Sequence, residues 1–531
     1  MASAFDDNDL QRFRRLLNYY TEGSVYKVIG RTYSKDHVEC LIHMLEEKRG
    51  KEILAEVEKC IENCTPCQKE MLLYTVALCM KSKDNEVKQH ANKTFLLLCK
   101  SARELFMFLE FHKKLSRDLS SKGFGRSLKC TLNEWYNRQD PMELAVLTMN
   151  ESSYGGWSHR DVIRLAHLKG KSEGTSIIFK YLVKGLDEVK NVEIHHDNVQ
   201  KVVDYLTTIH TVRHSSDEHQ VARLIEKFNL VKSHVPTSLL GSKEVWNALI
   251  SEMSVAEILQ NLNKLAMIGF LEESYENNKK VIEILRSEED LQKSSIQPMQ
   301  VLIAMSLYEN GKGGKMTWTR NDVVRDALNF ALESTIKNIK PTNKRYLIAV
   351  RVGANKKKST VRGTQALSSV VTAAAMSMII ARKEDKVHLV YFADKAIQLP
   401  LTSESSLKEI IEEISKQALV SASDTDIGSS DVIKPQCDMT APIRWASENS
   451  KQIDVFINIT DSLERTGEIT PSKALMQYRK EMNMPKSKLV TCGLANANMK
   501  TADPHDHRMI DIAGFDSTVP IIIRKFILDE C

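Results

Sequence analysis

Basic side chains recur at helical spacing near residue 160. Arg160 and Arg164 are four residues apart and His167 follows three residues later, so a helix over Ser158–Lys169 would present all three on one face. Guanidinium and imidazole groups in such a stripe can bind the phosphates of a nucleic acid. Lys169 extends the basic region at the end of the predicted helix. The alternative is a solvated helix face, which commonly carries charge stripes of this kind.

A second pair of cations, Arg126 and Lys129, lies three residues apart on another predicted helix. Between Phe111 and Lys184 the chain has 13 lysines and arginines against 7 acids, a surplus of 6 that exceeds the net charge of +5 of the whole chain. Such a local excess is typical of a surface that binds a polyanion. Because A-form RNA hides its bases in a deep major groove, these stripes would bind the shape of a duplex, with specificity from bulged or splayed bases.

We find no motif that predicts nucleotide hydrolysis or metal-dependent proteolysis, because Gly-x-x-x-x-Gly-Lys and His-Glu-x-x-His are both absent. Cys60, Cys64 and Cys67 lack a fourth ligand at zinc spacing, so buried thiols are the preferred interpretation. The segment Asp503–His507 has metal-ligand residue types, but its Asp-Pro start favours a turn. We therefore expect no enzymatic activity and no cofactor.

Two kinds of structure are predicted to position these residues. From about residue 8 to 340, apolar positions recur at helical spacing with short polar breaks, which predicts a solenoid of HEAT-like helix pairs. Beyond Pro341, short β-rich runs alternate with helices, which predicts a mostly parallel sheet covered by helices on both faces. The predicted strands are 346–350, 387–392, 454–459 and 488–494, and the predicted helices are 364–382, 405–417 and 471–482.

Six segments along nearly the whole chain resemble one family. They are RLLNYYTEGSVY at 15–26, GRSLKCTLNEWYN at 125–137, GWSHRDVIRLAHLKGKSEG at 156–174, SKEVWNALISEM at 242–253, 310–318 and ADPHDHRMIDIAGFD at 502–516. Together they are similar to the TROVE domain of the Ro ribonucleoprotein family and its von Willebrand A domain. The resemblance implies a TROVE helical-repeat RNA-binding domain over 1–340, forming a closed ring, and an α/β von Willebrand A-like domain over 341–531.

The resemblance also implies a function. Y RNAs would bind on the outer surface of the ring, through contacts that match Arg160, Arg164 and His167 most directly, while 3′ ends of misfolded RNAs such as pre-5S rRNA would pass through the ring. Stabilisation or quality control of small noncoding RNA would follow. The alternative from another class is a helical-repeat adaptor whose A domain recruits a protein partner. In that case apolar surface residues, rather than the basic stripes, would carry the affinity.

In von Willebrand A domains a divalent ion is held by an Asp-x-Ser-x-Ser run, a threonine and a further aspartate, and Mg²⁺ requires such oxygen ligands. In this chain the corresponding positions are Arg351, Gly353, Asn355, Cys437 and Asp461, in that order. Only the last of these positions keeps its acid, so we predict a degenerate site that holds no metal. Our hypothesis is that Arg351 replaces the ion by forming a bidentate ion pair with Asp461.

Two further expectations concern location and single-stranded RNA. The N-terminus has neither a basic nor an apolar signal region, and the longest apolar run, Val370–Ala381, is too short for a membrane span. We therefore expect a cytoplasmic protein with no membrane partner, and leave a nuclear share open. Basic and aromatic residues near the N-terminus could line the ring for single-stranded RNA, with a place in the core as the alternative. They are Arg14, Arg15, Tyr19, Tyr20 and Tyr26.

Overall fold

The computed structural model of the 531-residue chain describes residues 3–31, 33–61, 66–118, 124–190, 192–353, 361–364, 366–423, 438–461, 469–496 and 498–529. The chain divides into two compact units. Unit 1 comprises Met1–Leu17 and Tyr33–Met253, and unit 2 comprises Asn18–Thr32 and Ser254–Cys531. Within the described ranges, no helix combines the length and the apolar character that a bilayer span requires.

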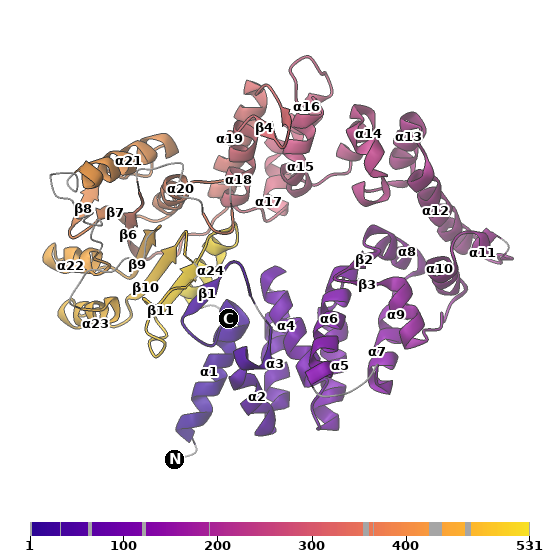
Figure 1. Cartoon of the computed structure of the whole chain (residues 1–531), viewed down its shortest axis with the longest axis horizontal. Coiled ribbons are helices and arrows are strands. Elements are labelled where there is room, and N and C mark those ends of the chain that lie inside the picture. The colour runs from indigo at the N-terminus through magenta and orange to yellow at the C-terminus, as the bar shows by residue number, and fades with distance from the viewer. Residues whose placement is uncertain are drawn as a thin grey trace, which may run out of the picture. The chain divides into compact units, whose positions relative to one another are not determined.

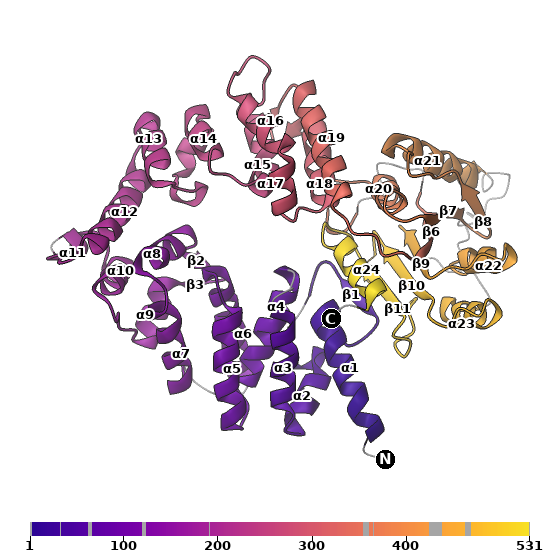
Figure 2. The same cartoon turned by 180° about the vertical axis from the view of Figure 1, so that it is seen from behind.

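Unit 1 is built mainly from helices, as the apolar spacing predicts (Figure 1 and, from behind, Figure 2). Consecutive helices pack side by side, for example α4 against α5 and α6, and α8 against α10 and α12. The helices are α1 (Ser3–Tyr19), α2 (Glu39–Glu46), α3 (Gly50–Ile61), α4 (Pro66–Cys79), α5 (Asn85–Leu98), α6 (Ala102–Asp118), α7 (Arg126–Asn137), α8 (Pro141–Asn150), α9 (His159–Ala166), α10 (Glu173–Lys184), α11 (Asp187–Lys190), α12 (Asp197–His214), α13 (Glu218–Phe228) and α14 (Lys243–Ile250).

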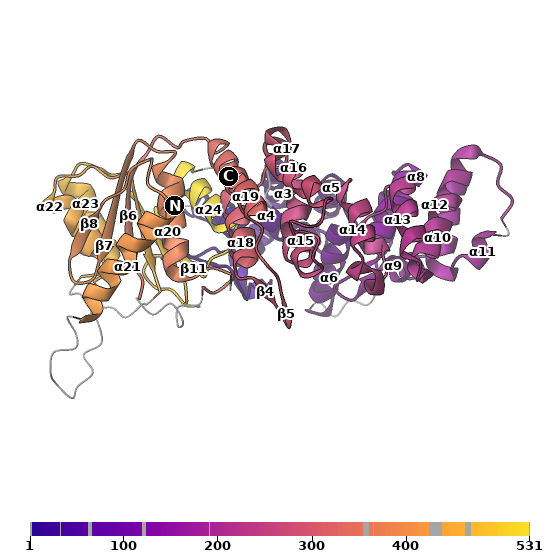
Figure 3. The same cartoon turned by 90° about the horizontal axis from the view of Figure 1, so that it is seen from above.

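Each unit also has a short β-hairpin between two helices. In unit 1, β2 (Ser153–Tyr154) pairs with β3 (Trp157–Ser158) across Gly155 and Gly156, whose φ angles of +58° and +79° suit the tight turn that only glycine adopts easily. In unit 2, β4 (Lys312–Gly313) pairs with β5 (Met316–Thr317), and Figure 3 shows this hairpin extending beyond the neighbouring helices of its own unit.

In unit 2, five helices lie along the chain between β1 and the other six strands of a seven-stranded sheet. The helices are α15 (Val255–Met267), α16 (Asn278–Arg286), α17 (Glu288–Lys293), α18 (Pro298–Glu309) and α19 (Asp322–Lys337). The strands, in spatial order, are β1 (Val25–Lys27), β11 (Met509–Ala513), β10 (Lys488–Gly493), β9 (Val455–Thr460), β6 (Arg345–Arg351), β7 (Lys386–Phe392) and β8 (Ala396–Leu399). All neighbouring strands are parallel except β8, which is antiparallel to β7. The predicted mostly parallel sheet is therefore confirmed.

Helices cover both faces of this sheet (Figure 1). One face carries α22 (Ala441–Glu448) and α23 (Pro471–Glu481), which bury a core with Leu347, Phe456 and Leu489 of three neighbouring strands. The other face carries α20 (Ser369–Ala381) and α24 (Val519–Leu528), and α21 (Leu407–Ser423) packs on α20. The small residues Ala373–Ala375 of α20 are fully buried, as expected for a helix that lies close to a sheet.

The four strands predicted from the sequence are present as β6, β7, β9 and β10, and the three predicted helices as α20, α21 and α23. Strands β1, β8 and β11 were not predicted. The sheet unit also includes segments of the predicted helical region, since β1 and α15–α19 belong to unit 2. The boundary predicted after residue 340 lies between α19 and β6, and as a boundary between domain families it stays a prediction.

Candidate nucleic-acid interface

Helix α9 presents two arginines to solvent. A capping box sets its start, because the Ser158 Oγ accepts the N–H of Asp161 at 3.2 Å and the Asp161 carboxylate accepts the N–H of Ser158 at 3.1 Å. Arg160 and Arg164 are both exposed and lie one helical turn apart. The predicted stripe is therefore confirmed for these two residues. Arg164 also lies in the last turn, where the helix dipole favours a cation.

Helix α7 carries the second pair of cations and is anchored to α9 through its buried face. Arg126 and Lys129 both lie on the face of α7 that is opposite to the buried one. Arg126 is exposed and Lys129 is half-buried. The hydroxyl of Tyr136 hydrogen-bonds to Nδ1 of His159, the first residue of α9, at 2.6 Å. Burial lowers the pKa of His159 to about 3, so its imidazole is neutral at physiological pH. This buried bond fixes the two cationic helices against each other.

The residues after α9 do not continue the predicted helix. The helix ends at Ala166, and His167 has a φ of 54°, so its exposed imidazole leaves the stripe of the two arginines. The N–H of Lys169 then donates to Asn133 Oδ1 at 3.2 Å, and Asn137 Nδ2 donates to the Lys169 carbonyl at 3.0 Å. The prediction of a helix through Lys169 is therefore wrong, because side chains of α7 bind this segment in place of a further helical turn.

This binding brings Lys169 to the outer face of α7. Asn133 and Asn137 follow Arg126 and Lys129 at helical spacing, so the four residues form one row that is roughly 16 Å long at 1.5 Å per residue. The N–H of Lys171 donates to Asn137 at 2.7 Å and adds another exposed lysine at the end of the row. We call this surface the basic face. Its members are Arg126, Lys129, Arg160, Arg164, His167, Lys169 and Lys171.

Ion pairing distinguishes the arginines and lysines of the basic face from neighbouring cations in the sequence. None of the arginines and lysines of the basic face forms an ion pair with an acid in the part of the chain that the structure describes. By contrast, lysines that flank the basic face in the sequence are paired, since Lys114 binds Glu110 at 2.8 Å and Lys184 binds Glu188 at 3.3 Å. The charges of the basic face therefore remain available for an external anion.

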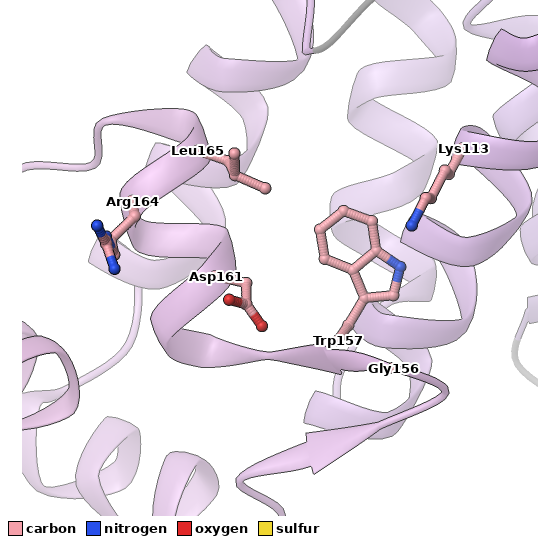
Figure 4. Close-up of a pocket in the computed structure, with 6 residues that line it drawn as sticks. All are labelled: Lys113, Gly156, Trp157, Asp161, Arg164 and Leu165. Carbon is pink, nitrogen blue, oxygen red and sulfur yellow. The ribbon is translucent and has the colours of Figure 1, made fainter.

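A pocket of about 510 Å³ opens beside Arg164 (Figure 4). It lies between α6, the β2–β3 hairpin and α9, and is lined by Lys113, Gly156, Trp157, Asp161, Arg164 and Leu165. The ammonium of Lys113 is 5.3 Å from the centroid of the Trp157 ring. Sequence reasoning did not single out Lys113 or Trp157, because α6 and the hairpin are separate in the sequence and only the fold brings them to α9.

The residues Gly170–Gly174 have the Gly-x-Ser-x-Gly spacing of a hydrolase nucleophile elbow. In such enzymes the serine sits at a sharp turn from a strand to a helix. Here the segment follows α9, and the Ser172 Oγ accepts the N–H of Thr175 at 3.1 Å as the N-cap of α10. A side chain at Gly170 would meet the backbone nitrogen of Ser176 at 2.5 Å, which explains the first glycine by packing. The serine is thus a helix cap.

The segment Asp503–His507 is a turn, as the sequence favoured. Asp503 Oδ1 accepts the N–H of His505 at 2.9 Å, and Asp506 forms an ion pair with Arg479. Two of its acids are therefore already engaged within the chain. The arrangement is structural and gives no support to a metal site.

Three of the five basic and aromatic residues near the N-terminus are buried, and the other two, Arg14 and Tyr20, are half-buried. Arg15, Tyr19 and Tyr26 are buried, and Tyr26 lies on β1 at the edge of the sheet. Arg14 forms two hydrogen bonds of 3.0 Å with a glutamate carboxylate of α3. Tyr20 packs against Tyr26 with 5.9 Å between ring centroids. The core alternative is therefore confirmed for Arg15, Tyr19 and Tyr26, which cannot offer a stacking surface to single-stranded RNA.

At the carboxyl ends of β6 and β9, Arg351 and Asp461 do not form the predicted ion pair. Arg351 is in register with Thr460, and since successive side chains of a strand point to opposite faces, the following Asp461 points away from it. The buried guanidinium of Arg351 instead donates to the Tyr391 hydroxyl at 2.8 Å. One carboxylate oxygen of Asp461 accepts the N–H of Gly353 at 2.8 Å.

This donor set does not suit a divalent cation. A guanidinium stands where the first acidic ligand would be, and one oxygen of the retained acid already accepts a backbone N–H. Burial raises the pKa of Asp461, while that hydrogen bond and the charge of Arg351 oppose the rise. Asn355 and Cys437, the other predicted positions of the degenerate site, lie outside the described residues.

Two family models match this chain, and the first of them extends from unit 1 into the helices of unit 2. The family model for the TROVE domain matches residues 32–312, and the model for the Ro60 vWA domain matches residues 345–527. Two relatives are both named RNA-binding protein RO60. The chain is 27% identical to the one from Caenorhabditis elegans over 98% of this chain and 88% of that protein. It is 27% identical to the one from Deinococcus radiodurans over 86% of this chain and 81% of that protein.

A solved structure has the same fold. The crystal structure of the Deinococcus radiodurans RO (RSR) protein superposes with a TM-score of 0.85 at 24% sequence identity. The superposition covers 98% of this chain and all of that chain.

Proposed function

Because the TROVE model covers more than half of its residues, this chain belongs to the TROVE-domain family with a Ro60 vWA domain, and we propose that it binds folded RNA on the basic face. Both relatives are named RNA-binding proteins, and neither name is that of an enzyme. The proposed role is therefore to hold RNA rather than to change it covalently.

The observation that carries this proposal is a set of cations on α7, on α9 and on the segment after α9 that pair with no acid in the described ranges. A protein that neutralises phosphates releases counterions from the nucleic acid, and each such contact adds to the affinity. Cations already held in ion pairs would lose those partners on binding, which would offset the gain. Free guanidinium and ammonium groups on two helices fixed to each other have no such cost.

We further propose which RNAs are bound. Y RNAs, as small structured noncoding RNAs, present a duplex that two cationic helices can bind by shape. The resemblance to the Ro family suggests that misfolded RNAs such as pre-5S rRNA pass their 3′ ends through a ring, for stabilisation or quality control. The buried state of Tyr19 and Tyr26 means that other side chains would have to contact those ends.

Location and protein partners belong to the same proposal. Cys79, Cys99 and Cys492 are buried thiols that form no disulfide with a described residue, which suits a reducing compartment such as the cytoplasm, with a share in the nucleus left open. The A domain would recruit a protein partner without the help of a metal. Fractionation of cells and capture with the A domain would test these two points separately.

The experiment is a binding titration with a small hairpin RNA, followed by fluorescence anisotropy at low salt. The double variant Arg160→Ala/Arg164→Ala should bind at least about tenfold more weakly than the wild type, because two phosphate contacts are lost. Its thermal unfolding should not change, since both side chains are exposed.

The matched control is Arg223→Ala/Lys227→Ala on α13, which removes two exposed cations at the same i, i+4 spacing in the same unit. It should bind nearly as the wild type does. Equal loss in both double variants would reduce the effect to net charge and contradict the proposal. Full affinity in both would favour the protein-adaptor alternative.

A further inference from the structure

Two acidic side chains approach one histidine where α1 meets α2 (Figure 1). His43 of α2 hydrogen-bonds through Nδ1 to Oδ2 of Asp9 on α1. The Nε2 of the same imidazole lies 3.6 Å from Oε1 of Glu47. One ligand atom from each of the three residues lies within 4.8 Å of the other two. Imidazole and carboxylate groups gathered in this way are donors that zinc accepts in proteins.

The backbone holds the three side chains in position. His43 lies in the last turn of α2, and Glu47 ends this helix with its N–H bonded to the carbonyl of His43. The two residues are therefore four positions apart on one face of the helix, a spacing at which two side chains can bind one metal ion. Asp9 comes from another helix and is only 7% exposed. A metal bound by all three residues would cross-link α1 to α2.

An arginine orients each of the two carboxylates. Oδ1 of Asp9 accepts a hydrogen bond from Arg12 at 3.3 Å, which leaves Oδ2 directed at His43. Oε2 of Glu47 accepts a hydrogen bond from Arg49 at 3.5 Å, which leaves Oε1 toward the imidazole. Outer partners of this kind orient the ligating carboxylates of metal sites. Both acids thus present one oxygen to the same imidazole.

The linked charges around the imidazole have a negative surplus. Arg12 also lies 3.6 Å from a carboxylate oxygen of Glu39, and Arg49 also binds Glu52 at 2.7 Å. With the two acids beside the histidine, four carboxylates share two guanidinium groups, a difference of two negative charges. A divalent cation would neutralise this difference, whereas the extra proton of an imidazolium would neutralise only half of it.

The spacing of the donors suits zinc after a small movement. Bonds of about 2.0–2.2 Å to nitrogen and oxygen place neighbouring ligand atoms of a tetrahedral site roughly 3.4 Å apart. The side chains of His43 and Glu47 are 54% and 40% exposed, so both can rotate around the buried Asp9 to reach this spacing. Water would supply the fourth ligand. Mg²⁺ prefers an octahedral shell of oxygen atoms, so this set of donors does not suit it.

We propose that Asp9, His43 and Glu47 bind a zinc ion that holds α1 against α2. The ion takes the place of the hydrogen between His43 Nδ1 and Asp9 Oδ2, which is released to solvent as a proton, while the imidazole keeps its hydrogen on Nε2. The three ligands belong to unit 1 and share no residue with the basic face. This inference is therefore independent of the proposed function.

The test is zinc binding by the full chain after a chelator has removed any metal. Calorimetry at about pH 8, where protons compete little for the ligands, should show that the wild type binds one Zn²⁺ per chain more than His43→Gln does. Co²⁺ should give the visible absorption of a tetrahedral site in the wild type and a weaker absorption in the variant. Zn²⁺ should also raise the temperature of unfolding of the wild type more than that of the variant.

Glu47→Gln separates a metal site from an ion pair. This variant keeps the hydrogen bond between His43 and Asp9, so its unfolding without metal should resemble that of the wild type. Its affinity for Zn²⁺ should fall at least about tenfold, because the loss of even an outer partner of a metal ligand costs that much. An affinity equal to that of the wild type would contradict a site with three protein ligands.

The matched control is His219→Gln on α13. His219 also lies close to two acids, Glu218 and Glu244, but no member of this second group is buried. Two of its members are adjacent in the sequence, and adjacent side chains diverge on a helix. The control should bind Zn²⁺ and Co²⁺ as the wild type does. If His43→Gln binds as much zinc as the wild type, or if the control loses as much as His43→Gln, the proposal is wrong and His43 forms only an ion pair.

Discussion

The basic face of unit 1 and the sheet of unit 2 both contain charged side chains, but the two regions place them differently. On the basic face the guanidinium and ammonium groups are mostly exposed and have no described partner acid. In the sheet unit, several charged residues are buried or half-buried and bind other groups of the chain. Arg351, Lys488 and Asp511 are buried, and Asp461 is half-buried.

Because of this difference, we expect the charges of the sheet to affect the stability of the fold and those of the basic face to affect RNA binding. A buried charge that is fully hydrogen-bonded contributes to the fold and has little capacity left for a ligand. An exposed cation without a partner contributes little to stability and remains available to an anion. We therefore expect substitutions in the sheet to change unfolding but not RNA affinity, and substitutions on the basic face to do the reverse.

The largest effect is expected at Lys488. Its ammonium donates to the carbonyls of Phe526 and Ile527 at 2.7 and 3.0 Å, at the end of α24, and the residue is only 6% exposed. Lys488→Met keeps the length of the side chain but removes a donor from buried carbonyls. The free energy of unfolding, measured with urea, should fall by about 3 kcal/mol.

The control for this variant is Lys480→Met, at an exposed position of α23, which should unfold as the wild type does. The RNA affinity of folded protein should be unchanged in both variants. A strong loss of RNA affinity in Lys488→Met alone would contradict the separation of the two regions.

A pH-dependent effect of similar or smaller size is expected at Asp511. This fully buried carboxylate accepts the N–H groups of Thr501 and Ala502 at 2.7 and 3.0 Å. Burial raises the pKa of Asp511 to about 6, although these two hydrogen bonds oppose the rise. The folded state therefore keeps this proton up to about pH 6, whereas an unfolded chain releases it near a pKa of about 3.9.

The direction of the pH effect follows from the difference in proton binding between the folded and the unfolded state. Between about pH 4 and pH 6 the folded state binds more protons at this site than the unfolded state, so its contribution to stability falls as the pH rises. Asp511→Asn keeps an oxygen acceptor and cannot ionise. Urea unfolding should show the variant more stable than wild type by up to about 3 kcal/mol at pH 8, with little difference at pH 4. If the free energy of unfolding changed with pH in the same way for both proteins, Asp511 would have no such role.

A moderate effect on binding alone is expected from Lys169→Gln. The hydrogen bonds that hold this residue against α7 come from its backbone, so loss of the ammonium should not affect stability. Affinity for a hairpin RNA should fall about two- to fivefold, with a salt dependence shallower by roughly 0.7–0.9 in log–log slope. An equal change in Lys480→Gln would mean that the position of the charge is unimportant.

The smallest effect is expected from divalent metal. Because Arg351 is buried at the first ligand position, 10 mM Mg²⁺ should leave thermal unfolding unchanged. A site with a Kd near 10 µM would instead stabilise the folded protein by about 4 kcal/mol at that concentration. Such a stabilisation, if lost in Asp461→Ala, would show that the carboxyl end of the sheet binds metal after all.

The sequence predicted those elements whose burial is continuous along the chain. All residues of Val455–Thr460 are buried, so the strand appears as an apolar run between polar segments. By contrast, Val25–Lys27 has three residues and pairs with Met509–Ala513 at the far end of the chain. No local pattern identifies so short a strand, because its partner supplies the hydrogen bonds.

The basic face was predicted in composition but not in geometry. Arg160 and Arg164 follow from helical spacing alone. The end of the helix at Ala166 does not, since His167 takes a left-handed conformation without being glycine. Asn133 and Asn137 bind the following segment from a helix more than thirty residues earlier, and such a long-range contact has no signal in a single sequence. The pocket depends on contacts between distant segments in the same way.

The salt dependence of RNA binding tests the central claim most directly. A variant in which five cations of the basic face become glutamine should be compared with the wild type over a range of salt concentrations. The five substituted cations are Arg126, Lys129, Arg160, Arg164 and Lys169. The log–log slope should become shallower by roughly 4, at about 0.7–0.9 for each phosphate contact, and thermal unfolding should stay the same. If the variant binds the hairpin with the slope and affinity of the wild type, the basic face is not the RNA-binding surface.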